Sequence, residues 1–420
     1  MNYFSGFTCV GCGERYASDR DLLLCPSCGN LLDAEYDYAR IRAEVDRDSI
    51  AGRPVGLWRW RELMPVLDDR AIVSLGEGDT PMLKCDRLAR WAGVRELWVK
   101  SDASNPTGSL KDRSITVSAT KAVEFGYRVL SCDSTGNKAS SAAAYAARAG
   151  LGCVVFCPED TPIPKVTQAL FFGAHLVRVR GHYSQINAMY RRLIHSGAVR
   201  WYDCGTDNPF RYEGKKSYAY EIARHFDWTV PDRVIHPANG GMSVAKDWKG
   251  FKELERLGWT RGRPKMTAVQ ASACNPIERA FRAGDRSVAP IEKGATIAGA
   301  LAGADPGLLG NRALEAVRES GGSVVGVPDD ETIEAMQMLA QEGLFIEPSG
   351  AVAVAGIRRM IRGGEAHPDE RIVCVVTGSG FKDFDRIAER VRIPEQVVTD
   401  YDAMLAAALA VQAVVAETTE

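Results

Sequence analysis

The sequence predicts an α/β protein built mainly on parallel strands, preceded by a small cysteine-rich unit. From about residue 71 onward, short β-rich apolar runs alternate with helical patterns, as in residues 127–134 before 137–150. Alternation of this kind is typical of parallel sheets whose faces are covered by helices. Two close pairs of cysteines lie ahead of this region, within residues 1–38.

The composition is that of an ordinary globular chain with room for two or three domains. The 420 residues carry a net charge of -2, and 25% of them are charged without any long run of Lys or Arg. Nucleic acids and membrane surfaces therefore lack electrostatic support as partners. No apolar run approaches the length of a membrane span, and the N-terminus lacks the pattern of a signal peptide. We expect a cytoplasmic protein.

Residues 1–38 carry the spacing of a zinc ribbon. Cys9 and Cys12 form one C-x2-C pair, and Cys25 and Cys28 form the second. Two such pairs provide four thiolates that can close a tetrahedral site, and a zinc ion held by four protein ligands is structural rather than catalytic. The alternative is four unligated thiols. The remaining cysteines are scattered through apolar segments and are expected to be small buried side chains.

Two further segments flank the α/β region, which we place at residues 71–400. Residues 39–70 have the pattern of a helical, charged connector, and residues 401–420 are Ala- and Val-rich and predict a C-terminal helix.

Three glycine-rich turns follow predicted strands, at residues 133–137, 237–241 and 377–380. Ligands of open parallel sheets bind at the carboxyl ends of strands, and backbone N–H groups in such turns suit a phosphate or a carboxylate. None of the turns matches the dinucleotide motif GxGxxG or the P-loop. A single turn of this kind also serves plain packing, but three in one chain favour a binding site.

Lys111 has an unusual predicted position. Ser109 and Asp112 fit a capping box, so a helix is expected to begin at Leu110 and to hold Lys111 in its first turn. The helix dipole disfavours a cation there, and a lysine short of counter-charges has a lowered pKa. A readily neutral lysine is a nucleophile that forms a Schiff base with carbonyls such as pyridoxal phosphate. The alternative is a solvated lysine without a special role.

The segment "NPTGSLKDR" (105–113) resembles the lysine motif of the fold type II, or tryptophan synthase β, superfamily of pyridoxal-phosphate enzymes. The whole set of motifs, from 74–82 to 377–383, is most similar to the threonine synthase family, some members of which also carry an N-terminal ribbon. The resemblance implies two α/β subdomains around a central cofactor cleft, the smaller at roughly 113–210. It also implies a homodimer, with residues 39–70 as a candidate part of the interface.

The resemblance implies a cofactor site for pyridoxal 5'-phosphate. Lys111 matches the lysine that bonds to the cofactor and then moves protons. Asn137 matches the residue at the cofactor's 3-hydroxyl, and Thr377 matches the hydroxyl that faces its pyridine nitrogen. The implied cofactor-binding residues are Lys111, Asn137, Ala238, Asn239, Gly240, Gly241, Met242 and Thr377.

The resemblance also implies a site for a small, phosphorylated amino acid. The turn that begins at Ser134 matches the loop for the substrate carboxylate. Arg211, in "NPFRYEGKKS" (208–217), matches the arginine for the substrate phosphate in the family segment N-P-x-R-x-E-G-x-K. The implied substrate-binding residues are Ser134, Thr135, Gly136, Lys138, Thr206 and Arg211.

Several positions depart from the family pattern. A lysine, Lys138, replaces the threonine after S-T-G-N, and Gly205-Thr206 replaces Asn-Ser. Met242 replaces the final asparagine of the phosphate cradle, and Ser379 replaces the histidine of T-G-H-G. Either the substrate phosphate is still held, by Arg211 together with Lys138, or the substrate has changed while the cofactor chemistry remains.

The sequence leaves three functions open. The first is a pyridoxal-phosphate lyase of amino-acid biosynthesis that converts O-phospho-L-homoserine and water to L-threonine and phosphate. The second is β-elimination or β-replacement on serine, O-phosphoserine or a related amino acid. The third is a nucleic-acid or protein-binding module with an inactive α/β body. The third is disfavoured because residues 1–38 hold more acidic than basic side chains and because the segment around Lys111 is intact.

Overall fold

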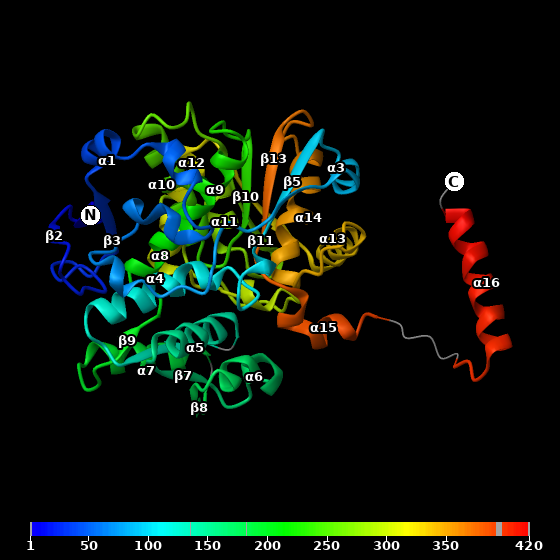
Figure 1. The fold of residues 1–420 in the computed structure, drawn as a ribbon, viewed down its shortest axis with the longest axis horizontal. Coiled ribbons are helices and arrows are strands. Elements are labelled where there is room, and N and C mark those ends of the chain that lie inside the picture. The colour runs from blue at the N-terminus through cyan, green and yellow to red at the C-terminus, as the bar shows by residue number, and fades with distance from the viewer. Residues whose placement is uncertain (1, 135, 182, 392–396, 419–420) are drawn as a thin grey trace. The chain divides into compact units, whose positions relative to one another are not determined.

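The computed structural model describes residues 2–134, 136–181, 183–391 and 397–418 (Figure 1). The chain divides into two units, residues 1–384 and residues 385–420. The first unit contains three sheets, and the second contains α16 (Tyr401–Thr418) and all but the first residue of α15 (Phe384–Ala388). In the described part of the chain, no helix has the length and apolar character that crossing a membrane requires.

The N-terminal sheet is small and antiparallel, with the order β2-β1-β3. Its strands are β1 (Phe4–Cys9), β2 (Arg15–Ala17) and β3 (Leu32–Tyr36). The sheet brings the turn after β1 next to the turn before β3, which are the two turns that carry the cysteines. The segment that follows consists of short pieces, α1 (Tyr38–Glu44), α2 (Arg47–Ala51) and the 3-10 helix η1 (Leu57–Leu63).

The central sheet has six strands in the order β12-β11-β10-β13-β5-β4. They are β4 (Met82–Lys84), β5 (Glu96–Ser101), β10 (Arg233–Pro237), β11 (Lys265–Ala271), β12 (Ser323–Val327) and β13 (Arg371–Val376). All neighbours are parallel except β4, which is antiparallel to β5 at one edge. The strands β10 and β12 are buried along their whole length, as expected for parallel strands covered on both faces.

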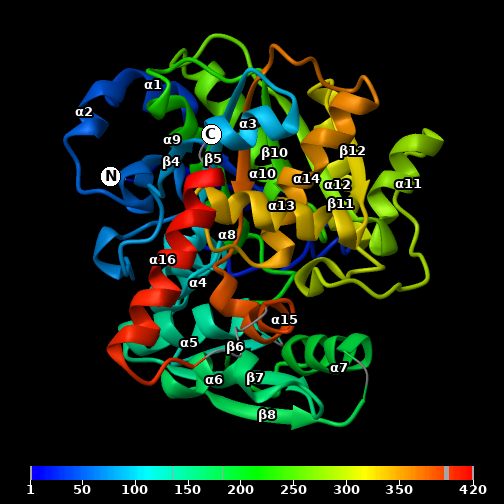
Figure 2. The same cartoon turned by 90° about the vertical axis from the view of Figure 1, so that its right-hand side faces the viewer.

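Helices cover both faces of the central sheet (Figures 1 and 2). One face packs against α3 (Asp86–Ala92), α13 (Asp329–Gln341) and α14 (Pro348–Arg362). The other packs against α9 (Ser217–His225), α10 (Met242–Arg256), α11 (Pro276–Ala283) and α12 (Gly307–Glu319), and its core is continuous with the N-terminal sheet. The ribbon is thus built onto the central sheet's core.

The third sheet is fully parallel, with the order β8-β7-β6-β9. Its strands are β6 (Val129–Asp133), β7 (Gly152–Pro158), β8 (His175–Val179) and β9 (Tyr202–Asp203). The helices of this region are α4 (Lys111–Glu124), α5 (Asn137–Ala149), α6 (Ile163–Phe171) and α7 (Tyr183–His195). From β9 the chain returns to the central sheet through α8 (Phe210–Glu213) and the 3-10 turn η4 (Gly214–Lys216).

The predicted fold class is therefore confirmed: two α/β sheets with a small cysteine-bearing sheet at the N-terminus. One local prediction was wrong. Helix α4 begins at Lys111 with Leu110 as its cap, and the Ser109 hydroxyl accepts the backbone N–H of Lys111 at 3.4 Å. The Asp112 carboxylate instead accepts the backbone N–H and the hydroxyl of Thr107, each at 2.7 Å, so it fixes the turn before the helix.

Candidate active site

Three segments that are distant in the sequence meet around Lys111. The backbone of Leu110 donates to Thr377 at 2.8 Å, and that of Ser379 donates to Gly108 at 2.9 Å. On the other side of the same turn, Glu347 donates to Gly378 at 3.0 Å. The end of β13 is thus held between the turn before α4 and the turn before α14.

Lys111 lies half-buried at the first position of α4. Burial lowers the pKa of its ammonium to about 8, and the nearby cations Arg211 and Lys138 act in the same direction, while Glu347 acts in the opposite one. The lowered pKa that the sequence predicted is therefore present. Its cause is burial and neighbouring cations, whereas the sequence argument invoked the helix terminus.

Asn137 and Glu347 meet beside this lysine. The Asn137 amide donates to both carboxylate oxygens of Glu347 at 3.2 Å. Burial raises the pKa of Glu347, which is 4% exposed. Sequence reasoning missed Glu347: its only signal is one carboxylate in the segment "EPSG" before a helix, a pattern that ordinary helix starts also show.

The glycine-rich turn at 238–241 fits a phosphate cradle. Gly241 has φ +77° and a Cβ there would lie 2.3 Å from the Cβ of Ala313, so no side chain fits at this position. Gly241 immediately precedes α10, whose first turn presents unpaired backbone N–H groups. The residues present therefore fit the phosphate of the cofactor.

Met242 and Asn239 belong to the same turn and the helix start that follows it. Met242 is the first residue of α10 and lines a cavity between α10, α12 and the ribbon. The Asn239 side chain packs against the backbone of Gly303: a Cβ at Gly303 would come within 1.8 Å of the Asn239 side-chain oxygen, so only glycine fits there.

Thr377 directly follows β13 and is 5% exposed. A Cβ on Gly350 would lie 3.0 Å from the Thr377 backbone nitrogen, so the start of α14 packs closely against this residue. Ser379, two residues on, accepts the backbone N–H of Phe381 and caps a short 3-10 turn.

The turn after β6 forms the start of α5. The Ser134 hydroxyl accepts the backbone N–H groups of Gly136 at 3.2 Å and Ala139 at 3.3 Å. Thr135 lies outside the described residues. The Lys138 ammonium donates to Asp133 at 2.7 Å, so a carboxylate partner already neutralises the lysine that the sequence offered as a phosphate ligand.

Arg211 is buried without a carboxylate partner among the described residues. Its side chain is 5% exposed and donates to the backbone oxygens of Cys204 at 2.9 Å and Gly205 at 2.6 Å, and its buried Nε has no partner in the described chain. The backbone oxygen of Thr206 in the same loop accepts the Tyr212 hydroxyl at 2.8 Å. A buried guanidinium with only neutral acceptors is a suitable partner for an anionic ligand.

Lys215 is a second buried cation in this region. Unlike Arg211, it was not identified from the sequence. It is 6% exposed, and its ammonium donates to the Ser243 hydroxyl at 2.8 Å. It falls at the variable position of the N-P-x-R-x-E-G-x-K segment, where the sequence offered no motif to mark it.

The four ribbon cysteines form one cluster. Their sulfur atoms all lie within 4.8 Å of one another, with Cys9 and Cys28 at 3.4 Å and Cys12 and Cys25 at 3.6 Å. Zinc–sulfur bonds of about 2.3 Å in a tetrahedron require sulfur separations of about 3.8 Å, so the cluster fits a structural zinc ion.

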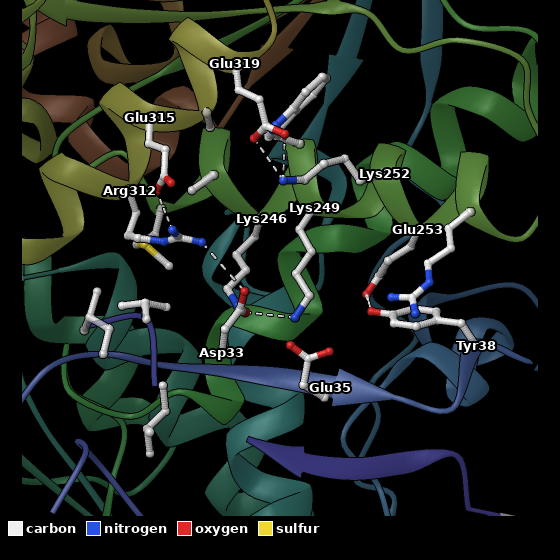
Figure 3. A pocket seen from close by; sticks show the side chains of 18 residues that line it. Asp33, Glu35, Tyr38, Lys246, Lys249, Lys252, Glu253, Arg312, Glu315 and Glu319 are labelled. Carbon is white, nitrogen blue, oxygen red and sulfur yellow. Dashed lines mark hydrogen bonds and ion pairs between the residues drawn. The ribbon is translucent and has the colours of Figure 1, made fainter. Parts of the chain in front are cut away.

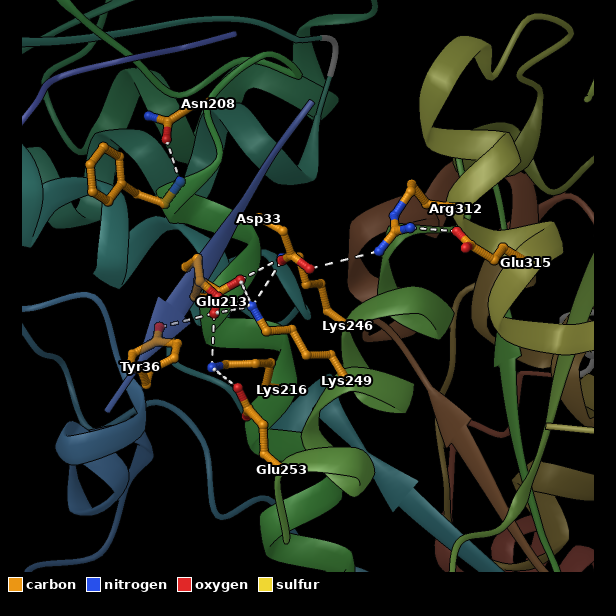
Figure 4. A network of polar contacts seen from close by, with 12 residues as sticks. Asp33, Tyr36, Asn208, Glu213, Lys216, Lys246, Lys249, Glu253, Arg312 and Glu315 are labelled. Carbon is orange, nitrogen blue, oxygen red and sulfur yellow. Dashed lines mark hydrogen bonds and ion pairs between the residues drawn. The ribbon is translucent and has the colours of Figure 1, made fainter. Parts of the chain in front are cut away.

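A charged cavity of about 420 Å³ separates the ribbon from α10 and α12 (Figure 3). Figure 4 shows that cations and carboxylates at its floor neutralise one another: Lys246 and Lys249 both donate to Asp33, at 2.5 and 2.8 Å. Except for Met242, none of the predicted cofactor or substrate residues that the structure describes lines this cavity.

Comparisons with known proteins define the class. Residues 73–378 match the family described as pyridoxal-phosphate dependent enzymes. The threonine synthases of Methanocaldococcus jannaschii and Methanosarcina acetivorans are 40% and 38% identical over 398 residues, which cover 94% of this chain and 97% and 96% of theirs. The chain therefore belongs to the threonine synthase family within the pyridoxal-phosphate dependent enzymes, as its motifs predicted.

Solved structures agree with the fold. Maize serine racemase superposes with a TM-score of 0.64 at 18% identity, over 80% of this chain and 99% of that one. The processed form of threonine deaminase isoform 2 from Solanum lycopersicum gives 0.63 at 20% identity, over 74% and 83%. At these identities the likeness shows the fold alone.

Proposed function

We propose that the protein converts O-phospho-L-homoserine and water to L-threonine and phosphate. The proposal depends on the family to which the chain belongs and, in the structure, on one observation: a buried Arg211, without a carboxylate partner among the described residues, lies close enough to Lys111 to lower its pKa. Apart from the α-carboxylate, which the turn at Ser134 is expected to receive, a neutral amino acid offers no anion for this guanidinium, whereas a phosphate monoester supplies its counter-ion.

In this proposal, the residues Lys111, Asn137, Thr377 and 238–241 hold the cofactor. When bound, pyridoxal phosphate supplies an electron sink that acidifies the carbons next to the amino group of the substrate. The turn at 238–241 receives the phosphate, and Asn137 is held beside the ring site by Glu347.

Lys111 moves the protons. Its amine, with a pKa of about 8, is readily neutral and accepts a proton from the substrate carbon chain. Overall, the Cγ–O bond breaks, phosphate leaves with the electron pair, water adds a hydroxyl at Cβ, and a proton is returned to Cγ. Arg211 binds the leaving phosphate and helps to orient that bond.

A second candidate is elimination or replacement at Cβ of serine or O-phosphoserine. The Lys138–Asp133 ion pair favours the unphosphorylated substrate of the two, serine, because the lysine that was expected to reinforce phosphate binding already has a partner.

Product analysis decides between the two. Purified protein supplied with the cofactor and O-phospho-L-homoserine is expected to release threonine and phosphate in equal amounts, and Lys111→Ala is expected to release neither. Arg211→Met should lower kcat/KM at least about thirtyfold while the affinity for the cofactor stays unchanged. Consumption of O-phosphoserine with phosphohomoserine left untouched would establish the second candidate instead.

We also propose that the ribbon holds one zinc ion per chain. Elemental analysis of the purified protein is expected to find this zinc, and replacing Cys9 with Ser should abolish it. Because the ribbon's core is continuous with that of α10, zinc loss should lower the melting temperature of the whole first unit. A metal-free protein with an unchanged melting temperature would contradict the structural role.

The four-part division into residues 1–38, 39–70, 71–400 and 401–420, the cytoplasmic location and the homodimer remain proposals. Sedimentation equilibrium is expected to give twice the mass of the chain.

A further inference from the structure

Lys215 is a buried cation that the proposed mechanism does not use. It lies in η4, is 6% exposed, and has Ser243 as its hydrogen-bond partner. Among the described residues it forms no ion pair. Its charged neighbours include the cations Lys111 and Arg211 and the Asp102 carboxylate. Burial and the two cations lower the pKa of Lys215 well below its usual value, and Asp102 acts in the opposite direction.

The next residue shows how this fold treats a lysine with a purely structural role. Lys216 is fully buried and forms ion pairs with Glu213 at 2.8 Å and Glu253 at 2.9 Å. Two buried lysines stand side by side in the chain, and only one has carboxylate partners within the described structure. A buried ammonium without a counter-ion is costly, so the surroundings of Lys215 are those of an anion-binding group.

The position of Ser243 indicates which anion this is. Ser243 is the second residue of α10 and follows Gly241, the glycine whose conformation and crowding leave room only for backbone in the cradle. No side chain in the described chain caps this helix, so its first N–H groups are available together with the Ser243 hydroxyl. The Lys215 ammonium therefore lies at the N-terminus of α10, next to the predicted phosphate cradle.

We propose that Lys215, together with Ser243, binds the phosphate group of pyridoxal phosphate and supplies the positive charge that the glycine-rich turn lacks. This inference rests on the cofactor of the proposed function and goes beyond the residues that the motifs marked. It separates two phosphate sites: Lys215 acts on the cofactor, and Arg211 acts on the substrate.

The test compares two ligands that differ only in the phosphate. Apoprotein is titrated with pyridoxal phosphate and with pyridoxal. The dissociation constant for pyridoxal divided by that for pyridoxal phosphate measures how much the phosphate group contributes to binding. Lys215→Gln is expected to reduce this ratio about tenfold to a hundredfold by weakening pyridoxal-phosphate binding alone, because a charge-assisted hydrogen bond is lost. Ser243→Ala should reduce it by a smaller factor.

Phosphorus NMR gives a readout that does not depend on turnover. The signal of the bound cofactor phosphate is expected to shift in Lys215→Gln and to remain in place in Lys252→Gln. Lys252 is a matched control because it lies on α10 but is half-exposed and pairs with Glu319. Thermal melts establish that each variant is folded, and Ser243→Ala keeps the inference testable if Lys215→Gln does not fold.

Two outcomes would overturn the inference. In the first, both ligands weaken equally in Lys215→Gln. In the second, the ratio of the two dissociation constants is unchanged while KM for the phosphorylated substrate rises. That result would assign Lys215 to the substrate phosphate. The product assay is independent: a protein that makes no threonine but shows the Lys215-dependent ratio retains this inference and loses only the substrate assignment.

Discussion

Lys111 is a residue whose chemistry is set by its surroundings. Burial and the cations Arg211 and Lys138 favour its neutral form, and Glu347 favours the charged form. Because only the neutral amine bonds to a carbonyl, the apoprotein's rate of reaction with pyridoxal should rise with pH and level off above a midpoint of about 8.

Two variants should move this midpoint in opposite directions. Arg211→Met removes a cation and is expected to raise the midpoint, while Glu347→Gln removes an anion and is expected to lower it. Stopped-flow absorbance across a pH series measures the midpoint for the wild type and for both variants. A common midpoint near the ordinary lysine value would contradict the electrostatic account.

Asp112 makes a second prediction at this scale. Burial raises its pKa to about 6, so its protonated form is favoured by the folded state relative to the unfolded chain. Its contribution to stability is therefore present at low pH and is lost as pH rises through about 6.

The free energy of unfolding of the wild type minus that of Asp112→Asn should accordingly fall by about 2–3 kcal/mol between pH 4 and pH 7. Urea unfolding at each pH measures it. Asp86→Asn, which removes an exposed carboxylate at the start of α3, is measured alongside as the comparison. A difference that stays flat with pH would refute the buried-acid assignment.

Sequence reasoning identified the site residues that belong to recognisable patterns and missed those that do not. Lys111 and the four ribbon cysteines stand in spacings with a chemical reason. Glu347 and Lys215 are isolated charged residues at positions that no motif marks. Their importance arises from their burial and from the residues that surround them. Neither property can be read from a sequence before the chain is folded.

At the scale of elements, one ionic network joins the ribbon to the central sheet's helices. Glu213 is fully buried at the end of α8 and contacts Lys216 at 2.8 Å and Lys246 at 2.5 Å (Figure 4). Lys246 in turn donates to Asp33 of β3. The Tyr36 hydroxyl of the same strand donates to Glu213 at 2.9 Å. The strand of the ribbon, the helix that begins at the phosphate cradle, and the turn that carries Lys215 are thus all bound to this one carboxylate.

Replacing Glu213 with Gln should lower the free energy of unfolding by about 3–5 kcal/mol, since buried cations lose their partner. Glu315→Gln is the control: this carboxylate lines the charged cavity beside the network and pairs with Arg312, but its side chain is 61% exposed and it should contribute no more than about 1 kcal/mol. Chemical denaturation measures both, and equal losses would contradict the distinction between the two carboxylates.

The order of elements was predictable from the alternation of strand and helix patterns, and their boundaries were less so. The start of α4 shows why. An acidic residue three positions after a serine fits a capping box, yet Asp112 binds the turn at Thr107 instead. Both arrangements satisfy the carboxylate, and only the tertiary position of the turn decides between them.

At the scale of the whole molecule, the core ends before the chain does. Among the described residues, none of the buried members of the three hydrophobic clusters lies beyond Val376. The apolar side chains of α16, such as Met404 and Leu409, are exposed. The buried clusters described for the first unit therefore contain no residue of α16.

Deletion of residues 397–420 is expected to leave the melting temperature and the rate of product formation unchanged. Calorimetry and the threonine assay measure the two quantities, with the full-length protein as the reference. A large drop in melting temperature would show that the tail contributes to the core after all.

The meeting of three distant segments at Lys111 has a consequence for how the protein is made. The turn before α4, the turn before α14 and the end of β13 are joined by backbone hydrogen bonds across more than half of the chain. Contacts at such sequence separation form late, because the long intervening loops must first be closed. During translation, the cofactor can therefore bind in this site only after β13, the last strand of the described chain, has been synthesised.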